Sequence, residues 1–399
     1  MRNAVIVDAV RTPIGRYKGV LKDIRPDDLG AMVIEALLKR NPELPKEQIE
    51  EVVFGNANQA GEDNRNVARM SGLLSGLPET VGGTTINRLC GSGLDAVMYA
   101  ARSIAVGEGD VFIAGGTESM TRAPFVMAKP DKDFPRGNME VYDTTIGWRF
   151  INPKLAEMYG TDSMPETAEN VAKRYNISRE EQDRFAFTSQ QRAKKAMNEG
   201  RFSSEIIPVI YHDKKGKRIQ IDRDEHPRPD TSLEKLAKLR PLFEQGTITA
   251  GNASGVNDGA SALLMMSEEK AKELGIKPLA RYVAGATAGL EPSIMGLGPI
   301  LASQKALARA KLSITTIGLV ELNEAFASQS LECIRQLDLD SEIVNVNGGA
   351  IAFGHPLGAS GARIVTTLIH EMQRRKVQYG LATMCVGVGQ GISVIVEGL

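Results

Sequence analysis

The chain has 399 residues, 42% of them hydrophobic and 24% charged, with a formal net charge of −1 at pH 7. This length predicts two or three domains, and the balanced charge gives no electrostatic reason to expect a nucleic acid or an anionic membrane as partner. No apolar stretch approaches the ~18 residues of a membrane span, and three scattered cysteines do not indicate a disulfide framework, so we expect a cytoplasmic protein of enzyme-like composition.

Segments typical of strands and helices alternate along the first 120 residues. Residues 4–9 are predicted to form a strand, and residues 26–40 an amphipathic helix. Val52 begins another strand, residues 94–106 have apolar positions at helical spacing, and residues 111–114 are typical of a buried strand. This alternation predicts an α/β architecture.

The central part of the chain, residues 121–250, differs in composition from the remainder. It has a higher proportion of charged residues and many prolines, which indicates surface loops and charged helices inserted between more apolar parts. Ser178, with Glu181 three positions later, predicts a capping box at the start of a helix that extends to Asn198. Loops on a rigid scaffold commonly recognise substrates, so we expect that role for this insertion.

The order of elements in the first part recurs near the end of the chain. Gly91-Ser92-Gly93, followed by a helix and a strand, corresponds to Ala359-Ser360-Gly361, a helix over residues 362–374 and a strand over residues 381–384. The letters match weakly. The pattern alone therefore leaves a duplicated domain and a chance repetition equally open.

Two of the three cysteines lie in glycine-rich segments that are suited to a catalytic residue. Cys90 precedes Gly91-Ser92-Gly93, and Cys385 precedes Val386-Gly387. A buried, inert cysteine is the ordinary alternative for Cys90. The helix expected to begin after Cys90 favours a thiolate instead, because the positive end of a helix dipole lowers the pKa of a thiol. Cys333 has an amphipathic helical context without glycine and is predicted to be a core residue.

One of the four histidines is a catalytic candidate. His355 lies between Gly354 and Pro356, and it would supply the base that a thiolate nucleophile needs; the pattern alone leaves a structural role equally open. Asn323 follows an apolar strand, where it would either cap a helix or hold a water or polarise a carbonyl. Neither C-x-x-C nor H-E-x-x-H spacing occurs, so we expect no metal site.

Four of these motifs occur in the order that characterises one enzyme family. Each motif alone is weakly specific, but together, over essentially the whole chain, they resemble the catalytic blocks of the thiolase family. Residues 143–150 and 162–170 are most similar to the β-ketoadipyl-CoA thiolase branch of that family. The four blocks are residues 90–93, 323–326, 354–356 and 385–387.

This resemblance implies a particular α/β fold. Two duplicated βαβαβαββ halves are expected to stack in five layers, α-β-α-β-α, with an inserted loop domain. The N-terminal half would comprise residues 1–120 with 249–275 completing it, and the C-terminal half residues 276–399. Residues 121–248 would form the loop domain, which holds coenzyme A.

The resemblance also implies a mechanism. His355 takes the proton of Cys90, whose thiolate attacks the keto carbonyl of a 3-oxoacyl-CoA, and Cys385 protonates the departing acetyl-CoA enolate. In reverse, Cys385 deprotonates acetyl-CoA for a Claisen condensation. His355 and a water held by Asn323 would form one oxyanion hole, and the backbone N–H groups of Cys90 and Gly387 the other.

The same resemblance implies coenzyme A as a co-substrate, with no permanently bound cofactor. A homodimer or homotetramer is expected, with acyl-CoA and CoA as the other partners. Contacts to coenzyme A are expected at Arg228, Phe243, Ser254 and Phe326.

The acyl specificity is predicted from a departure. Ser163-Met164-Pro165 stands where acetoacetyl-CoA-forming thiolases commonly carry His-Met-Gly. We therefore predict a preference for 3-oxoadipyl-CoA, or failing that for a longer fatty 3-oxoacyl-CoA, with Arg149 or Arg88 as candidate partners of a distal carboxylate. An acetyl-CoA C-acetyltransferase, which forms acetoacetyl-CoA, is the alternative.

Two other classes of protein are disfavoured. An acyl-carrier-protein ketosynthase would have a second catalytic histidine where this chain has Cys385. A non-catalytic acyl-CoA-binding relative would be expected to lack Cys90 or His355, and both are present.

Overall fold

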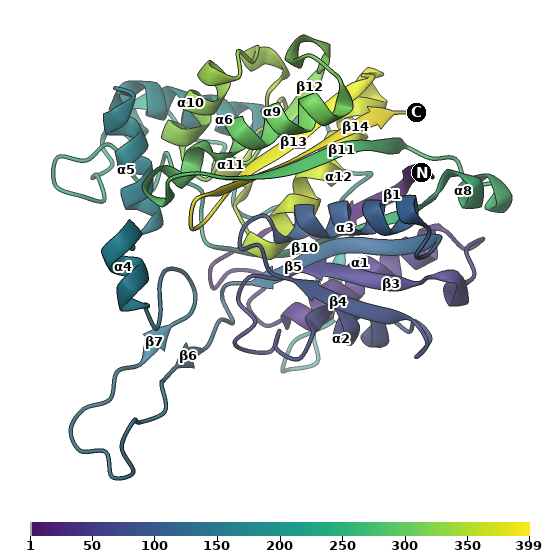
Figure 1. Cartoon of the computed structure of the whole chain (residues 1–399), viewed down its shortest axis with the longest axis horizontal. Helices are drawn as coiled ribbons and strands as arrows, with labels where there is room; N and C mark the ends of the chain where they lie inside the picture. Colours follow the sequence, from purple (N-terminus) through teal and green to yellow (C-terminus); the bar gives the residue numbers. More distant parts are fainter. Residues whose placement is uncertain (1) are drawn as a thin grey trace.

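The computed structural model describes residues 2–399. Within these residues a mixed ten-stranded sheet joins two similar halves (Figure 1). The strand order is β12-β13-β14-β11-β1-β10-β5-β3-β4, and the short β2 pairs with β10. The halves meet where β1 pairs with β11, through Val5 with Arg281 and Ile6 with Ala280.

The first half follows the order βαβαβαββ. The insertion separates its last two strands, so that β5 and β10, distant in sequence, pair antiparallel over nine residues. Its elements are β1 (Ala4–Arg11), β2 (Gly15–Arg16), α1 (Pro26–Arg40), η1 (Lys46–Gln48), β3 (Glu51–Gly55), α2 (Val67–Leu74), β4 (Gly82–Ile86), α3 (Ser92–Val106), β5 (Val111–Ser119), β10 (Asn257–Ser267) and α8 (Glu268–Leu274).

The second half repeats this order with one strand missing. Its elements are β11 (Ala280–Gly289), η2 (Pro292–Leu297), α9 (Gly298–Ala310), η3 (Ile314–Thr316), β12 (Leu319–Leu322), α10 (Ala327–Gln336), η4 (Ser341–Ile343), α11 (Ala350–Phe353), α12 (Leu357–Arg375), β13 (Tyr379–Val386) and β14 (Gln390–Gly398). In the described chain, the counterpart of β4 is reduced to a single parallel bridge between Val320 and Val344.

A side chain takes the place of the missing strand. Asn345 has a φ of +47°, which ends any extended run after Val344. The Asn345 amide accepts the Leu322 N–H at 2.9 Å and donates to the Leu322 carbonyl at 2.8 Å. These are the two hydrogen bonds that a neighbouring strand would make, so the edge of β12 is satisfied without one.

The elements form five layers, as predicted. The apolar sides of α1 and α2 cover one face of the first half, and α9 and α10 cover the outer face of the second. Helices α3 and α12 lie between the two halves and contribute Leu94, Val97, Ile364 and Leu368 to the central core. This arrangement confirms the expectation of two duplicated α/β halves.

The insertion lies between β5 and β10. Its elements are β6 (Phe125–Val126), β7 (Tyr142–Asp143), α4 (Pro153–Tyr159), α5 (Met164–Arg174), α6 (Arg179–Asn198), β8 (Val209–His212), β9 (Arg218–Ile221) and α7 (Leu233–Ala237). The ladder of β6 and β7 is the base of an arm that projects from the body (Figure 1). The capping box predicted at Ser178 is present and begins α6.

No helix in residues 2–399 combines the length and the hydrophobicity needed to cross a membrane.

Candidate active site

Cys90 lies in a tight turn between β4 and α3. Leu89, just before it, has a φ of +45°, in the left-handed region that leucine rarely adopts. The Ser92 hydroxyl holds this turn, because its Oγ accepts the Arg88 N–H at 2.8 Å and donates to the Leu89 carbonyl at 2.6 Å. A Cβ on Gly91 would lie 2.8 Å from Cγ2 of Val386, so the turn packs directly against the end of β13.

The expectation of a thiolate at Cys90 is wrong for the resting protein. The residue is buried, and burial raises the pKa of its thiol to about 11. The backbone N–H groups of Gly387 and of Cys90 itself lower this pKa, but by less than burial raises it. The position before α3 provides N–H groups that favour the thiolate. The sulfur is nevertheless removed from water, and this desolvation raises the pKa of the thiol by more than the N–H groups lower it. Cys90 is thus a neutral thiol until a base takes its proton.

His355 lies in the turn that leads into α12. Gly354 before it has a φ of +101°, and a Cβ there would overlap the side-chain amide of Asn257. The Asn257 Oδ1 accepts the His355 backbone N–H at 2.9 Å, and the Ser360 Oγ lies 2.6 Å from the ring Nδ1. Ser360 donates its own proton to the Pro356 carbonyl at 3.0 Å. We therefore assign the ring proton to Nδ1, which leaves the Nε2 lone pair available as a base.

The two turns meet where the central helices begin. A Cβ on Gly93, in the first turn of α3, would lie 2.6 Å from the Gly358 carbonyl in the first turn of α12. Burial, followed by the nearby Arg363, lowers the pKa of His355 to about 3, so its ring is neutral at pH 7. A neutral thiol and a neutral imidazole are thus carried by adjoining helix starts, one from each half.

Asn323 follows β12 and does not cap a helix, since α10 begins only at Ala327 and has Phe326 at its N-cap position. The Asn323 Nδ2 lies 3.5 Å from Nε2 of His355. Its Oδ1 is buried and has no hydrogen-bond partner among the described residues. Asn323 therefore faces the histidine, in line with the second of its two predicted roles.

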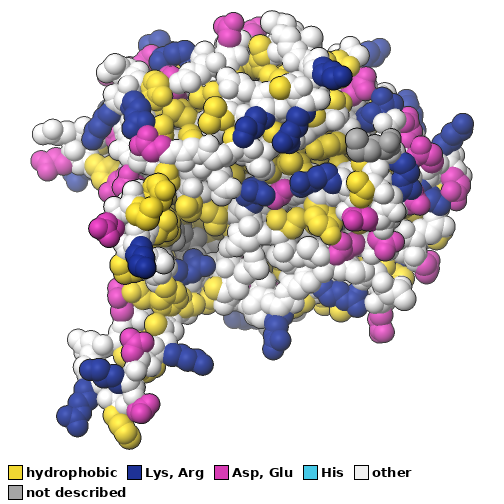
Figure 2. All heavy atoms as spheres, in the orientation of Figure 1, with side chains coloured by type: hydrophobic (Ala, Val, Ile, Leu, Met, Phe, Trp, Pro, Cys, Tyr) yellow, Lys and Arg dark blue, Asp and Glu magenta, His cyan; other side chains and the backbone are white. Residues whose placement is uncertain are grey.

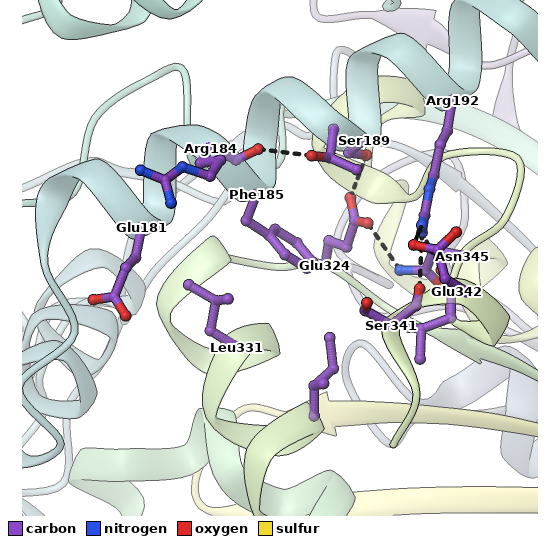
Figure 3. Close-up of a pocket in the computed structure, with 13 residues that line it drawn as sticks. Glu181, Arg184, Phe185, Ser189, Arg192, Glu324, Leu331, Ser341, Glu342 and Asn345 are labelled. Atoms are coloured by element: carbon purple, nitrogen blue, oxygen red, sulfur yellow. Dashed lines mark hydrogen bonds and ion pairs between the residues drawn. The ribbon is translucent and has the colours of Figure 1, made fainter. Parts of the chain in front are cut away.

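The neighbour of Asn323, Glu324, lines a separate cavity of about 360 Å³ between α6, α10 and residues 341–345 (Figure 3). Its carboxylate accepts Ser189 Oγ at 2.7 Å, Asn345 Nδ2 at 2.8 Å and the Ile351 N–H at 3.1 Å. Glu324 thereby ties three segments to the Asn323 turn. In the described chain, this cavity shares no lining residue with the one at Cys90.

Cys385 is the penultimate residue of β13 and is fully buried. Burial, and then the nearby Cys90, raise its pKa above that of an ordinary thiol. Gly387 comes directly after β13, and its backbone N–H is close enough to the Cys90 sulfur to lower the pKa of that thiol. The structure thus brings Cys90, Cys385 and Gly387 together. Cys333 is buried on α10, as predicted, and donates to the Gly296 carbonyl at 3.5 Å.

Two of the four residues expected to contact coenzyme A lie together. Ala253 and Phe326 form an isolated antiparallel bridge, and the Ser254 N–H donates to the Ala325 carbonyl at 2.9 Å. Ser254 therefore lies beside Phe326, which shares a buried cluster with Cys385.

The other two expected contacts lie on the insertion. Arg228 is exposed, and its backbone N–H donates to Gln190 Oε1 at 2.9 Å. Phe243 is half-buried in a turn closed by the Gly246 N–H. No hydrogen bond within residues 2–399 joins either of them to Ser254.

A cavity of about 460 Å³ opens at Cys90. Its walls come from the Cys90 turn, the starts of α5 and α12, Gly387 and residues 144–150 of the insertion. Arg149 lines it, whereas Arg88 is occupied by Asp95 at 2.7 Å and by Gln390 at 3.0 Å.

The two neighbouring residues at the start of α5 have different positions. Ser163 forms the capping box of α5 with Glu166, so its hydroxyl serves the helix. Met164, the next residue, lines the cavity at Cys90.

One supporting residue that the sequence did not reveal is Glu118, near the end of β5. Its carboxylate lines the cavity and accepts the N–H groups of Ala57 at 2.8 Å, Asn58 at 3.1 Å and Gly358 at 2.8 Å. Burial raises its pKa to about 7. Glu118 thus fastens the start of α12, from the second half, to a loop of the first half.

Asn257 and Ser360 were also missed as site residues. Ser360 lies in the small-residue motif Ala359-Ser360-Gly361, which is the one sequence feature that indicates this part of the site. Among the described residues, no three His, Cys, Asp or Glu side chains are grouped as metal ligands.

Comparisons with known proteins agree with this geometry. Models of the thiolase N-terminal and C-terminal domains match residues 4–269 and 276–398. The chain is 59% identical over 100% of both sequences to the 3-oxoadipyl-CoA/3-oxo-5,6-dehydrosuberyl-CoA thiolase of Escherichia coli. It is 55% identical, again over 100% of both, to a beta-ketoadipyl-CoA thiolase of Acinetobacter baylyi.

Solved structures give the same result. The acetyl-CoA acetyltransferase of Bacillus anthracis superposes with a TM-score of 0.93 at 42% identity, over 100% of this chain and 99% of that one. Human mitochondrial 3-ketoacyl-CoA thiolase gives 0.92 at 43% identity, with the same coverage. The chain belongs to the thiolase family, and it is therefore an acyltransferase.

Proposed function

We propose that this thiolase cleaves 3-oxoadipyl-CoA with coenzyme A to give succinyl-CoA and acetyl-CoA, through an acyl group carried on Cys90. One observation supports the chemistry: the buried Cys90 thiol, whose pKa is lowered by the backbone N–H groups of Cys90 and Gly387, lines a cavity where the two central helices begin. The substrate is suggested by the names of the relatives that are 55–59% identical over the full length.

In the first half-reaction, Nε2 of His355 takes the proton of the Cys90 thiol as the sulfur attacks the 3-oxo carbonyl. The pKa values of about 11 for Cys90 and about 3 for His355 support a transfer that accompanies the attack, because neither group ionises alone near pH 7. The bond between C2 and C3 then breaks. Cys385 gives its proton to the acetyl-CoA enolate, and succinyl remains on Cys90 as a thioester.

In the second half-reaction, the thiol of a second coenzyme A attacks the Cys90 thioester and loses its proton to the Cys385 thiolate, while His355 returns its proton to the departing Cys90 thiolate. Succinyl-CoA leaves, and Cys90 and Cys385 return to neutral thiols. Coenzyme A is thus a co-substrate, consumed and released in each cycle, and the mechanism uses no permanently bound cofactor. Arg228, Phe243, Ser254 and Phe326 are the proposed contacts to it.

Two oxyanion holes serve these steps. The N–H groups of Cys90 and Gly387 would stabilise one oxyanion, and this role is supported by the effect of both groups on the pKa of Cys90 and by their place in the wall of the same cavity. His355 and a water held by Asn323 would form the other, which the unpartnered Oδ1 of Asn323 supports. Removing one such donor typically costs about 3–4 kcal/mol of transition-state stabilisation.

The test compares substrates on the purified protein and locates the acyl group. We expect thiolysis of 3-oxoadipyl-CoA to have a higher kcat/KM than thiolysis of acetoacetyl-CoA. After incubation with acetyl-CoA, digestion and mass spectrometry should place the acetyl group on the peptide that contains Cys90. Labelling mainly at Cys333 or Cys385 would contradict the assignment of the nucleophile.

An acetyl-CoA C-acetyltransferase is the second candidate. A relative from Chromobacterium violaceum with that activity in its name is 48% identical over 98% of the chain, and the superposed Bacillus anthracis structure has it too. A preference for acetoacetyl-CoA by about tenfold or more, which corresponds to 1.4 kcal/mol, would favour this candidate.

We also propose that the chain forms a homodimer or homotetramer. The projecting arm and its base expose apolar side chains (Figure 2). The most exposed of the large ones there include Phe134, at 86%, and Phe125, at 70%. Exposed apolar surface of this kind is characteristic of protein contacts. Light scattering coupled to gel filtration should give two or four times the chain mass of 43.1 kDa.

A further inference from the structure

The cavity at Cys90 combines an apolar wall with one cation. Apolar side chains from both sides line it, among them Leu89, Ile146 and Met164. Of the described residues that line it, Arg149 alone carries a positive charge. An unbranched acyl chain needs only the apolar wall, so the guanidinium calls for a separate explanation.

Arg149 is half-buried and makes little use of its donors. Its one hydrogen bond within residues 2–399 is long, 3.4 Å from Nη2 to the Asn58 carbonyl, and it forms no ion pair there. A guanidinium has five N–H donors. The other charged residue of the wall, Glu118, already accepts hydrogen bonds from three backbone N–H groups. Arg149 therefore has donors available for a ligand.

Asn58 fixes the wall that carries Arg149. Its side-chain Nδ2 donates to the Thr144 carbonyl at 2.8 Å and to Thr144 Oγ1 at 3.1 Å, and its backbone N–H donates to Glu118. Asn58, Thr144, Glu118 and Cys90 all line the same cavity. The loop with Arg149 is thus joined to the body of the protein next to the nucleophile.

We propose that Arg149 binds the terminal carboxylate of the acyl group, so that the site selects 3-oxoacyl-CoA substrates that end in a carboxylate. This inference rests on the proposed function and names the residue that sets its specificity. A planar guanidinium matches a carboxylate with two parallel hydrogen bonds. The carboxylate belongs to the part of the substrate that stays on Cys90, so Arg149 holds it in both half-reactions.

Holding the carboxylate also protects the acyl-enzyme. In a succinyl thioester, a free carboxylate oxygen can attack its own thioester carbonyl, which forms a five-membered cyclic anhydride and expels the Cys90 thiolate. Water then opens the anhydride to free succinate, and the acyl group is lost to coenzyme A. A carboxylate paired with Arg149 keeps the chain extended and away from the thioester.

The experiment compares two substrates of equal chain length, 3-oxoadipyl-CoA and 3-oxohexanoyl-CoA, which has a methyl group in place of the carboxylate. The variants are Arg149→Leu, Arg149→Lys and, as control, Arg218→Leu at an exposed position of β9, outside the arm. We expect Arg149→Leu to lower kcat/KM for 3-oxoadipyl-CoA by about 10- to 100-fold, as loss of a charged hydrogen bond would. Its kcat/KM for 3-oxohexanoyl-CoA should change by less than about threefold, and Arg149→Lys should be intermediate.

A second readout follows the fate of the acyl group. Among the products of 3-oxoadipyl-CoA, the ratio of free succinate to succinyl-CoA should rise in Arg149→Leu and stay at the wild-type value in Arg218→Leu. Equal losses on both substrates with no extra succinate would overturn the proposal, because they indicate a structural role.

The failure of the proposed function would look different. It would appear in the wild-type protein, as a preference for acetoacetyl-CoA or 3-oxohexanoyl-CoA over 3-oxoadipyl-CoA. That result would overturn the inference about Arg149 together with the substrate assignment. An Arg149→Leu variant that keeps a wild-type preference for 3-oxoadipyl-CoA would overturn the inference alone.

Discussion

Two thiols at the same site have different surroundings. Backbone N–H groups of Cys90 and Gly387 lower the pKa of the Cys90 thiol, whereas Cys385 is fully buried with its pKa raised by burial and by Cys90. The first environment suits a nucleophile that must become an anion. The second keeps its proton until a strongly basic carbanion appears, which suits a general acid.

Replacing the second thiol should separate these roles. In Cys385→Ser we expect thiolysis and condensation to fall by about 10²- to 10⁴-fold, the usual contribution of a general acid or base. Acetylation of Cys90 by acetyl-CoA should survive, because no carbanion forms in that step. The measurement pairs steady-state rates with the mass of the labelled peptide.

The matched control is Cys333→Ser, at a buried thiol on α10. It should retain both activities in whatever fraction of the protein is folded. A folded Cys385→Ser protein that loses acetylation and cleavage equally would show that the roles of nucleophile and general acid are not divided between the two thiols.

Residues that could be predicted from the sequence share a local signal. Cys90, His355 and Cys385 stand beside glycines, and their order along the chain matches a family pattern. The residues that hold the His355 turn in place have no such signal. Asn257 and Glu118 accept hydrogen bonds from this turn, but they are separated from the residues they bind by 98 and 240 positions in the sequence. Leu89 was equally hidden, since nothing in a leucine predicts a positive φ.

At the scale of helices and strands, the close approach of the two central helices, α3 and α12, positions the site. A Cβ on Gly361 of α12 would lie 2.6 Å from Cβ of Leu94 on α3, and closer still to the Leu94 backbone nitrogen. The sequence predicted these helices and their repetition in two halves. It did not predict that the second half would replace a strand with the Asn345 side chain, because that replacement depends on a contact with Leu322, 23 residues away.

Gly361→Ala should therefore push α3 and α12 apart. We expect a loss of about 1–3 kcal/mol in the free energy of unfolding, as overpacking typically costs, and reduced activity as the starts of the helices separate. Urea unfolding followed by circular dichroism measures the first effect.

The control for this change is Gly72→Ala, in α2. A Cβ there would meet Val52 at 3.5 Å, an ordinary contact, so alanine should be neutral or stabilising by up to about 1 kcal/mol. If both variants proved equally stable, the close approach of the central helices would not be a constraint.

In the molecule as a whole, buried carboxyl groups and buried histidines change the stability of the fold with pH in opposite directions. Burial raises the pKa of Glu118 to about 7 and that of Glu321 to about 8, and it lowers that of His226 to about 4 and that of His355 to about 3. Stability falls with rising pH wherever the folded state binds more protons than the unfolded state. For the two carboxyls that range extends from their ordinary value of 4.5 up to 7 or 8.

The histidines act in the other direction, because the unfolded state binds their protons from pH 6.5 down to 3 or 4. The two effects oppose each other between pH 4.5 and 6.5, where we expect a plateau of stability. Below it, stability should be lost as the buried histidines are forced to charge. Above pH 6.5 only the carboxyls still act, so stability should decline up to pH 8.

Glu321→Gln tests this account, because it removes one of the two groups that act above pH 6.5. The decline between pH 6.5 and 8 should shrink by about 2 kcal/mol, at 1.36 kcal/mol per pH unit for one proton. This change in slope holds whatever constant penalty comes from leaving Arg363 without its partner, 3.6 Å from Glu321. Thermal unfolding at several pH values measures it, with Glu43→Gln at an exposed position as the control. A slope unchanged by Glu321→Gln would mean that Glu321 is already ionised in the folded protein, held as an anion by Arg363.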